Sequence, residues 1–215
     1  MLEAPGTAQR RRRFLTEPLP ESFYQRDTVE VARDLLGRVL YRSSPQGLTA
    51  GIIVETEAYL RDDPACHASR GKTRRNAPMF GPPGRAYVYF IYGNHFCFNV
   101  VTAPEGVGEA VLVRALEPVA GLELMQKRRG GIDNPLSLTS GPGKLCQALA
   151  ITADFNYHPL TEPPLWIGPG QGEAPGPIVT DRRIGISRAE DRLLRFYLAD
   201  NPYVSRRAKV EPRNY

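Results

Sequence analysis

The chain is organised around Gly51-Ile-Ile-Val-Glu-Thr-Glu-Ala-Tyr-Leu60 and Tyr87-Val-Tyr-Phe-Ile-Tyr-Gly-Asn-His-Phe-Cys-Phe-Asn99. The first stretch is rich in β-branched residues and predicts a strand that carries carboxylates out of an apolar run. The second has aromatic arms on either side of Tyr92-Gly-Asn-His95, a composition typical of a tight hairpin turn. Together the two stretches predict a sheet of antiparallel strands at the centre of the fold.

Further helices and strands are expected on both sides of these stretches. Asp27-Thr-Val-Glu30 has the pattern of a capping box and predicts a helix from Asp27 to Gly37. Pro118 suits the first turn of a helix and predicts one that runs to about Arg129, with Leu122 and Met125 inward. The other expected elements are strands at 38–42, 48–58, 109–116, 178–184 and 193–198, a strand around Trp166, and a helix from Ser140 to about Ile151.

Length and composition bound the architecture. A chain of 215 residues is expected to form one domain, and its 20 glycines and 20 prolines favour a loop-rich fold over a helical bundle. We therefore predict an α+β fold with a mixed, mainly antiparallel sheet, flanking helices and a protruding β-hairpin. Residues 1–19 are expected to form a flexible basic arm, 20–205 the domain and 206–215 a polar tail. Arg10 to Arg13 suit a solvated tail, a phosphate-binding arm or a targeting signal.

The charge pattern favours an anionic partner. The formal net charge is +5, and arginine supplies most of the positive charge, because the lysines are Lys72, Lys127, Lys144 and Lys209 alone. Arginine suits phosphate contacts through its rigid donor fork, which favours nucleic acid. Many basic proteins nevertheless bind no nucleic acid, so the charge by itself decides little.

Other composition signals exclude several classes of protein. Three widely spaced cysteines indicate a reducing compartment, and neither they nor the three histidines have the spacing of metal ligands. No cofactor-binding loop is visible, so neither a metal nor a cofactor is expected. No apolar run approaches the ~20 residues of a membrane span. No secretory signal is visible either.

The carboxylates of the first stretch need a reason to lie in an apolar strand. Side chains alternate in direction along a strand, so Glu55, Glu57 and Tyr59 are expected to share one face. Carboxylates in such a place are costly unless they are used or paired. Arginines could satisfy them, and Arg114, which lies within another apolar run, is the obvious partner of Glu57.

Three further features suit contact with a nucleic acid. Tyr92 at a hairpin tip is a candidate wedge for a base step, although a lone tyrosine in such a place more often packs on a neighbouring loop. The long basic loop 61–83 suits a phosphate backbone, but could also be only a solvated surface. Ser140-Gly-Pro-Gly-Lys144 offers free N–H groups and a cation at a helix start, and it lacks the spacing of a P-loop.

Several motifs in order carry a resemblance to a known family. They are Val54-Glu-Thr-Glu-Ala-Tyr59, Tyr87-Val-Tyr-Phe-Ile-Tyr-Gly93, Leu112-Val-Arg-Ala-Leu-Glu-Pro118, Ser140-Gly-Pro-Gly-Lys-Leu-Cys-Gln-Ala-Leu-Ala150, Arg195-Phe-Tyr and Asn201-Pro-Tyr-Val-Ser205. From Thr28 to Ser205 the chain closely resembles the alkyladenine (3-methyladenine) DNA glycosylase family. The resemblance implies a monofunctional hydrolase that flips 3-methyladenine, 7-methylguanine or hypoxanthine out of duplex DNA. It would cut the bond from base to sugar and so start base excision repair.

The resemblance also implies roles for the residues of the site. Glu57 occupies the position of a glutamate that activates a water, and Arg114 would help to hold the water and the carboxylate. Tyr59 would stack on one face of the flipped base, and His67 and Tyr89 would lie against the other. These five residues would form the reacting centre and the walls around the base.

The same resemblance assigns residues to specificity and to DNA contact. Asn99 would crowd the 2-amino group of guanine, and Tyr92 would fill the hole left in the duplex. The other positions expected to contact DNA are Asn94, Arg74, Arg75 and Lys144. Asn94 stands where a familiar vertebrate member has methionine, and the His67 loop is one residue shorter than in that member; both differences concern the choice of lesion.

Two other functions compete with the glycosylase. A non-catalytic nucleic-acid binder could use the same aromatic and basic residues, but it has little reason to aim Glu55 and Glu57 at a phosphate-rich partner. A small-molecule transferase would need a cofactor loop. A strand-cleaving lyase would need an amine nucleophile, and no lysine lies in the segments of Glu57 and Tyr89. We expect a monomer that acts on duplex DNA with damaged purines, in the cytoplasm with the nucleoid if bacterial and in the nucleus if eukaryotic.

Overall fold

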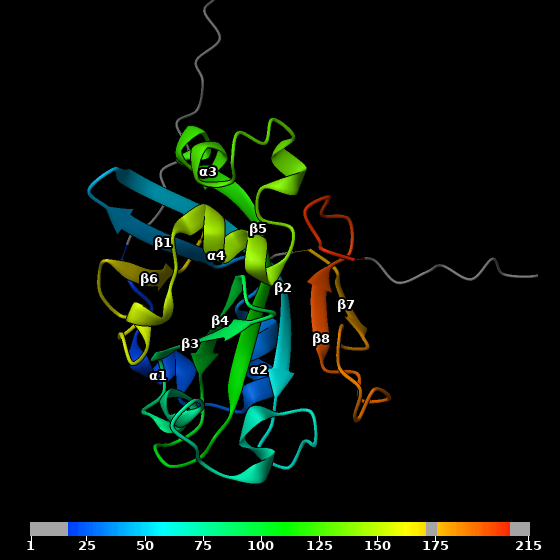
Figure 1. Ribbon diagram of the computed structural model, residues 1–215. Coiled ribbons are helices and arrows are strands. Elements are labelled where there is room, and N and C mark those ends of the chain that lie inside the picture. The colour runs from blue at the N-terminus through cyan, green and yellow to red at the C-terminus, as the bar shows by residue number, and fades with distance from the viewer. Residues whose placement is uncertain (1–16, 171–175, 207–215) are drawn as a thin grey trace, which may run out of the picture.

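The thirteen-residue strand β2 (Gly47–Tyr59) is the centre of the fold (Figure 1). In this computed structural model, which describes residues 17–170 and 176–206, β2 pairs along one edge with β5 (Ala110–Ala120). Its other edge pairs first with β1 (Val39–Ser44) and then, at Glu55–Glu57, with β8 (Arg195–Leu198). The carboxylates of β2 therefore lie in a segment with a strand on each side.

The remaining strands extend this sheet on both sides. Its order is β3-β4-β5-β2-β1-β6, with β7 joined through β8, and every pairing is antiparallel. In the view of Figure 1, β7 and β8 lie to the right of β2 and β1 and β6 to its left, although β1 and β8 pair with successive parts of one edge of this long strand. The edge strands are β3 (Ala86–Ile91), β6 (Leu165–Gly168) and β7 (Ile178–Asp181), and β4 (His95–Val101) lies between β3 and β5.

Short helices complete the α+β fold that the sequence predicts. The α-helices are α1 (Glu21–Tyr24), α2 (Thr28–Asp34), α3 (Leu122–Arg128) and α4 (Pro142–Leu149). The 3₁₀ turns are η1 (His67–Arg70), η2 (Ala77–Phe80), η3 (Pro135–Ser137) and η4 (Ala153–Phe155). None of the helices in the described part of the chain is both long and apolar enough to cross a membrane.

The start of α2 confirms the predicted cap. The carboxylate of Asp27 accepts hydrogen bonds from the N–H groups of Val29 and Glu30, at 2.9 and 3.1 Å. One core cluster contains the buried faces of α2 and α4 together with sheet residues such as Ile53 and Phe98. The hydroxyl of Thr56 donates to the carbonyl of Ala32, so β2 is tied directly to α2.

The region around Pro118 differs from its prediction. Strand β5 runs to Ala120, so Pro118 lies within a strand, opposite Gly51, and does not start a helix. The missing N–H of proline is tolerated because the pairing shifts its register there. The helix starts only after Gly121, which has a φ of 73°. Met125 is buried as expected, whereas Leu122 is 41% exposed, so the prediction that Leu122 points inward was wrong.

The predicted hairpin and chain ends can be placed in part. β3 and β4 pair from Ala86–Val100 to Ile91–His95, while protrusion of this hairpin from the body stays a prediction. Leu19 is buried and donates its N–H to Ile167 in β6. The arginine cluster at 10–13 and most of the predicted C-terminal tail lie outside the described residues.

Candidate active site

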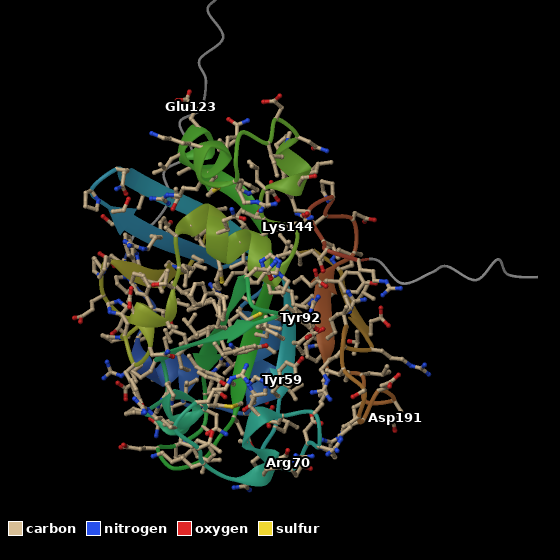
Figure 2. The ribbon with its side chains drawn as sticks, viewed as in Figure 1. Tyr59, Arg70, Tyr92, Glu123, Lys144 and Asp191 are labelled. Carbon is tan, nitrogen blue, oxygen red and sulfur yellow. The ribbon has the colours of Figure 1, made fainter. Side chains whose placement is uncertain are left out.

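A cavity of about 690 Å³ opens between the β3–β4 hairpin, the start of α4 and the segment after β7. In Figure 2, Lys144, Tyr92 and Tyr59 lie one below another along the middle of the molecule. The predicted site residues that line this cavity are Tyr59, His67, Tyr89, Tyr92, Asn99, Arg114 and Lys144. Residues from four distant parts of the sequence thus meet around one space.

Glu57 is fully buried beside this cavity and has three hydrogen-bond donors. Its Oε2 accepts from the Tyr59 hydroxyl at 2.9 Å and from Nη1 of Arg114 at 3.2 Å. Its Oε1 accepts from the N–H of Ile184 at 2.8 Å. Burial raises the pKa of Glu57 above its ordinary value, and Arg114, Ile184 and Tyr59 oppose that rise in pKa. The carboxylate is held in a fixed orientation and is a stronger base than an exposed glutamate.

The second carboxylate of β2 is used differently. Glu55 is also fully buried, and its Oε1 lies 2.7 Å from Nη1 of Arg195. Arg114 reaches both carboxylates, because its Nε lies 3.4 Å from Oε1 of Glu55. Both acids are therefore paired with arginines, as expected. Glu57 differs from Glu55 because it also accepts hydrogen bonds from Tyr59 and Ile184, which line the cavity.

Aromatic rings form the walls of the cavity. The rings of His67 and Tyr89 meet edge to face, with centroids 4.5 Å apart, and Nδ1 of His67 lies 2.8 Å from the hydroxyl of Tyr87. Burial, and then the charge of Arg75, lower the pKa of His67 below its ordinary value. Both effects favour the neutral form of the His67 imidazole. Its orientation is set by the Tyr87 hydroxyl.

Tyr59 forms another wall, and its ring packs against Arg183, which was not among the predicted site residues. The guanidinium of Arg183 lies 4.7 Å from the centre of the Tyr59 ring, donates to the carbonyl of Ala58 and forms a buried ion pair with Asp63. The next residue, Ile184, supplies the N–H that binds Glu57. Arg183 therefore links the Tyr59 wall, the start of the His67 loop and the carboxylate.

Asn99 has its amide group fixed by the backbone. Its Nδ2 donates to the carbonyls of Tyr87 and Cys97, at 3.0 and 3.3 Å. The loop that carries His67 is fixed in a similar way, because buried Asn76 donates to the carbonyls of His67 and Gly71. These hydrogen bonds hold the Asn99 side chain at the cavity and keep the His67 loop in place.

The predicted DNA-contacting residues fall into two groups. Tyr92 is 80% exposed at the hairpin tip with a φ of 55°, and Lys144 is an exposed residue of the cavity rim at the first turn of α4. Asn94, Arg74 and Arg75 are exposed outside the cavity lining. Nη2 of Arg75 donates to the carbonyl of Phe90, which fixes its loop to the hairpin.

Sequence reasoning missed the partners that come from the backbone and from the C-terminal half. The N–H of Ile184 has no side-chain signature, and Arg183 is one of many arginines in the chain. Tyr87 could have been found from the alternation of the strand, which puts it on the same face as Tyr89. Among residues 17–170 and 176–206, no group of three or more histidine, cysteine or acidic side chains is arranged to hold a metal.

Comparison with known proteins gives a consistent result. Residues 22–202 match the family model described as methylpurine-DNA glycosylase. A relative from Methanoculleus marisnigri is 60% identical over 193 residues, which cover 88% of this chain and 99% of the relative. A relative from Carboxydothermus hydrogenoformans is 54% identical over 190 residues, with the same coverage of 88% and 99%. Both carry the provisional name 3-methyladenine DNA glycosylase.

Proposed function

The chain belongs to the methylpurine-DNA glycosylase family, and from this membership we propose that it flips alkylated or deaminated purines out of duplex DNA and hydrolyses their N-glycosidic bond. Family and relatives make it a hydrolase, a DNA-3-methyladenine glycosylase of base excision repair. The proposed substrates are 3-methyladenine, 7-methylguanine and hypoxanthine in duplex DNA. The proposed reaction needs no cofactor. The enzyme is proposed to act as a monomer, in the cytoplasm with the nucleoid if bacterial and in the nucleus if eukaryotic.

The observation that carries the proposal is the environment of Glu57. Its carboxylate is buried, has a raised pKa and is fixed by three donors beside the cavity. A water next to it attacks C1′ of the sugar and gives its proton to the carboxylate, while the base leaves with the electrons of the C–N bond. The negative charge also stabilises the oxocarbenium character that the sugar develops. Arg114 orients the carboxylate and the water.

The aromatic walls suit a flipped purine. Tyr59 stacks on one face of the base, and the edge-to-face pair of His67 and Tyr89 covers the other. Stacking contributes roughly 1–3 kcal/mol per base, which offsets the cost of unstacking from the duplex. Tyr92 fills the vacated place in the duplex, and Asn94, Arg74, Arg75 and Lys144 contact the DNA around it.

Selection among purines combines leaving-group chemistry with exclusion. An alkylated purine in DNA is already cationic and departs readily, whereas hypoxanthine is neutral and benefits from protonation at N7. Undamaged purines fit the same walls, so Asn99, whose amide is held by two carbonyls, opposes guanine by crowding its 2-amino group. The ratio of the release rates of 3-methyladenine and hypoxanthine measures how much leaving-group chemistry contributes.

We propose that the enzyme does not cleave the DNA strand. A lyase needs an amine that attacks C1′. Within the described chain, Lys144 is the one lysine that lines the cavity. It is exposed at the rim, where it suits contact with a DNA phosphate. Treatment with borohydride during turnover should trap no protein–DNA adduct, and accumulation of such an adduct would refute this part of the proposal.

The test is single-turnover release of hypoxanthine and of 3-methyladenine from a duplex, with Glu57→Gln as the control. We expect release by the wild type and none by Glu57→Gln, while both bind the damaged duplex. If both bind and neither releases base, the chain is a non-catalytic DNA binder. If Glu57→Gln releases base at the wild-type rate, Glu57 is not the general base.

A further inference from the structure

The motif Asn201-Pro-Tyr-Val-Ser205 has no part in the function described so far, yet it is fastened to the sheet. Nδ2 of Asn201 donates to Oε2 of Glu117 at 2.7 Å, and Oδ1 of Asn201 accepts from the N–H of Tyr203 at 3.0 Å. Val204 is buried in a cluster with Val54 and Ala115, from β2 and β5. We refer to residues 201–206 as the C-terminal clasp; it follows β8 as the red segment of Figure 1.

The clasp ends on a buried carboxylate. The N–H of Ser205 donates to Oε2 of Glu55 at 2.7 Å. Nη1 of Arg195 lies 2.7 Å from Oε1 of Glu55 and also donates to the carbonyl of Arg206 at 2.6 Å. Arg195 itself is held by Asp181 and by the carbonyl of Arg182. Since Glu55 is fully buried, these donors decide where its carboxylate lies.

Glu55 is in turn connected to the proposed general base by one guanidinium. Nε of Arg114 lies 3.4 Å from Oε1 of Glu55, and Nη1 of Arg114 lies 3.2 Å from Oε2 of Glu57. Nε of Arg114 makes no regular hydrogen bond within the described chain. Its position therefore depends on the two carboxylates that attract it, and a displacement of Glu55 would displace Arg114 relative to Glu57.

We propose that Glu55 is a positioning residue for base release, and that the C-terminal clasp holds Glu55 in place through the N–H of Ser205 and through Arg195. The path from clasp to reacting centre is Ser205, Glu55, Arg114 and Glu57. This inference rests on the proposed function, because it concerns the same carboxylate. It gives the motifs Arg195-Phe-Tyr and Asn201-Pro-Tyr-Val-Ser205 a shared role.

The charges around Glu57 make the inference testable by pH. The charged and titratable groups that face Glu57 are Glu55 and Tyr59 from β2, Arg114 from β5 and Cys97 from β4, with Arg183 behind Tyr59 and Arg195 and Asp181 behind Glu55. Glu55 contributes to the raised pKa of Glu57, because a second negative charge disfavours ionisation. Without the charge of Glu55, Glu57 should ionise at lower pH.

The first experiment compares Ser205→Pro with Ser205→Ala in the full chain. Proline at 205 removes the N–H that binds Glu55, whereas alanine keeps it and removes a buried hydroxyl that has no hydrogen-bond partner among residues 17–170 and 176–206. We expect single-turnover release to fall about 10- to 100-fold in Ser205→Pro, as for a small misplacement of reacting groups, and to be unchanged in Ser205→Ala. Affinity for the damaged duplex should be unchanged in both.

A second variant guards against a Ser205→Pro protein that folds poorly. Glu55→Gln keeps the size of the side chain, and Arg195 retains Asp181. We expect the acid limb of its rate profile to move to lower pH than in the wild type, a change that a merely structural role does not produce. An unshifted limb, or a Ser205→Pro protein that melts earlier but releases base at the wild-type rate, would overturn the inference. Failure of the wild type to release base would instead overturn the proposed function.

Discussion

The hydroxyl of Tyr59 donates a hydrogen bond to Oε2 of Glu57 over 2.9 Å, so one side chain is both a wall of the cavity and a partner of the buried carboxylate. Such a bond favours the ionised form of the acid and lowers its pKa, in opposition to the effect of burial. One residue thus combines the proposed contact with the base and an effect on the pKa of Glu57.

Tyr59→Phe separates these two roles. The phenyl ring keeps the wall, while loss of the hydroxyl removes a contact that lowers the pKa of Glu57, so this pKa rises further. A general base acts in its deprotonated form, and its activity is lost as pH falls through its pKa. We expect the acid limb of single-turnover release to move to higher pH than in the wild type. Tyr89→Phe is the control, since the bond to Glu57 comes from Tyr59; an equal shift in both variants would contradict the assignment.

The ionisation of His67 should depend on Arg75. Burial lowers the pKa of His67 first, and the charge of Arg75 lowers it further. In Arg75→Gln, loss of that charge should raise the His67 pKa toward its ordinary value, without reaching it because burial remains. NMR titration of the three histidines can measure this directly. Arg74→Gln, an exposed neighbour, is expected to leave the His67 titration as it is.

The neighbouring acids Asp62 and Asp63 should differ sharply in their effect on stability. Asp63 is fully buried in an ion pair with Arg183, whereas Asp62 pairs with Arg192 at the surface. Asp63→Asn leaves a buried guanidinium without its counter-charge and should lower the free energy of unfolding by about 3–5 kcal/mol. Asp62→Asn should change it little, because exposed pairs are screened by water. Denaturant unfolding of both variants checks this. Equal losses of unfolding free energy would mean that the buried Asp63–Arg183 pair stabilises the fold no more than the surface pair.

Tyr92 should matter for duplex substrates and not for folding. Its side chain is 80% exposed at the hairpin tip, so Tyr92→Ala should leave the melting temperature nearly unchanged. Loss of about 1–3 kcal/mol of stacking should lower base release from duplex DNA by roughly 5- to 150-fold. Tyr157→Ala is a matched control, since Tyr157 is also exposed and also has a positive φ, of 68°. Equal losses in the two variants would argue against a wedge.

Much of the local structure was predictable from patterns of a few residues. The cap at Asp27 followed from the residue type at the helix start, and the strand of Glu55 and Glu57 from its β-branched composition. Arg114 lies within an apolar run and was therefore expected to pair with a carboxylate, and it pairs with Glu57. Pro118 misled the prediction, because a proline can start a helix or lie in a strand where the pairing shifts, and only the pairing with Gly51 distinguishes the two.

The sequence by itself determined which side chains could do the chemistry: a carboxylate, an arginine and aromatic rings in strands that alternate. The tertiary structure alone decided what fixes them. Ile184 donates to Glu57 across 127 positions of sequence, and Ser205 to Glu55 across 150. Every residue but proline carries a backbone N–H, so residue type does not reveal which one will meet a buried carboxylate. That is settled only when β8 pairs with β2, β7 pairs with β8, and the C-terminal clasp packs on β2.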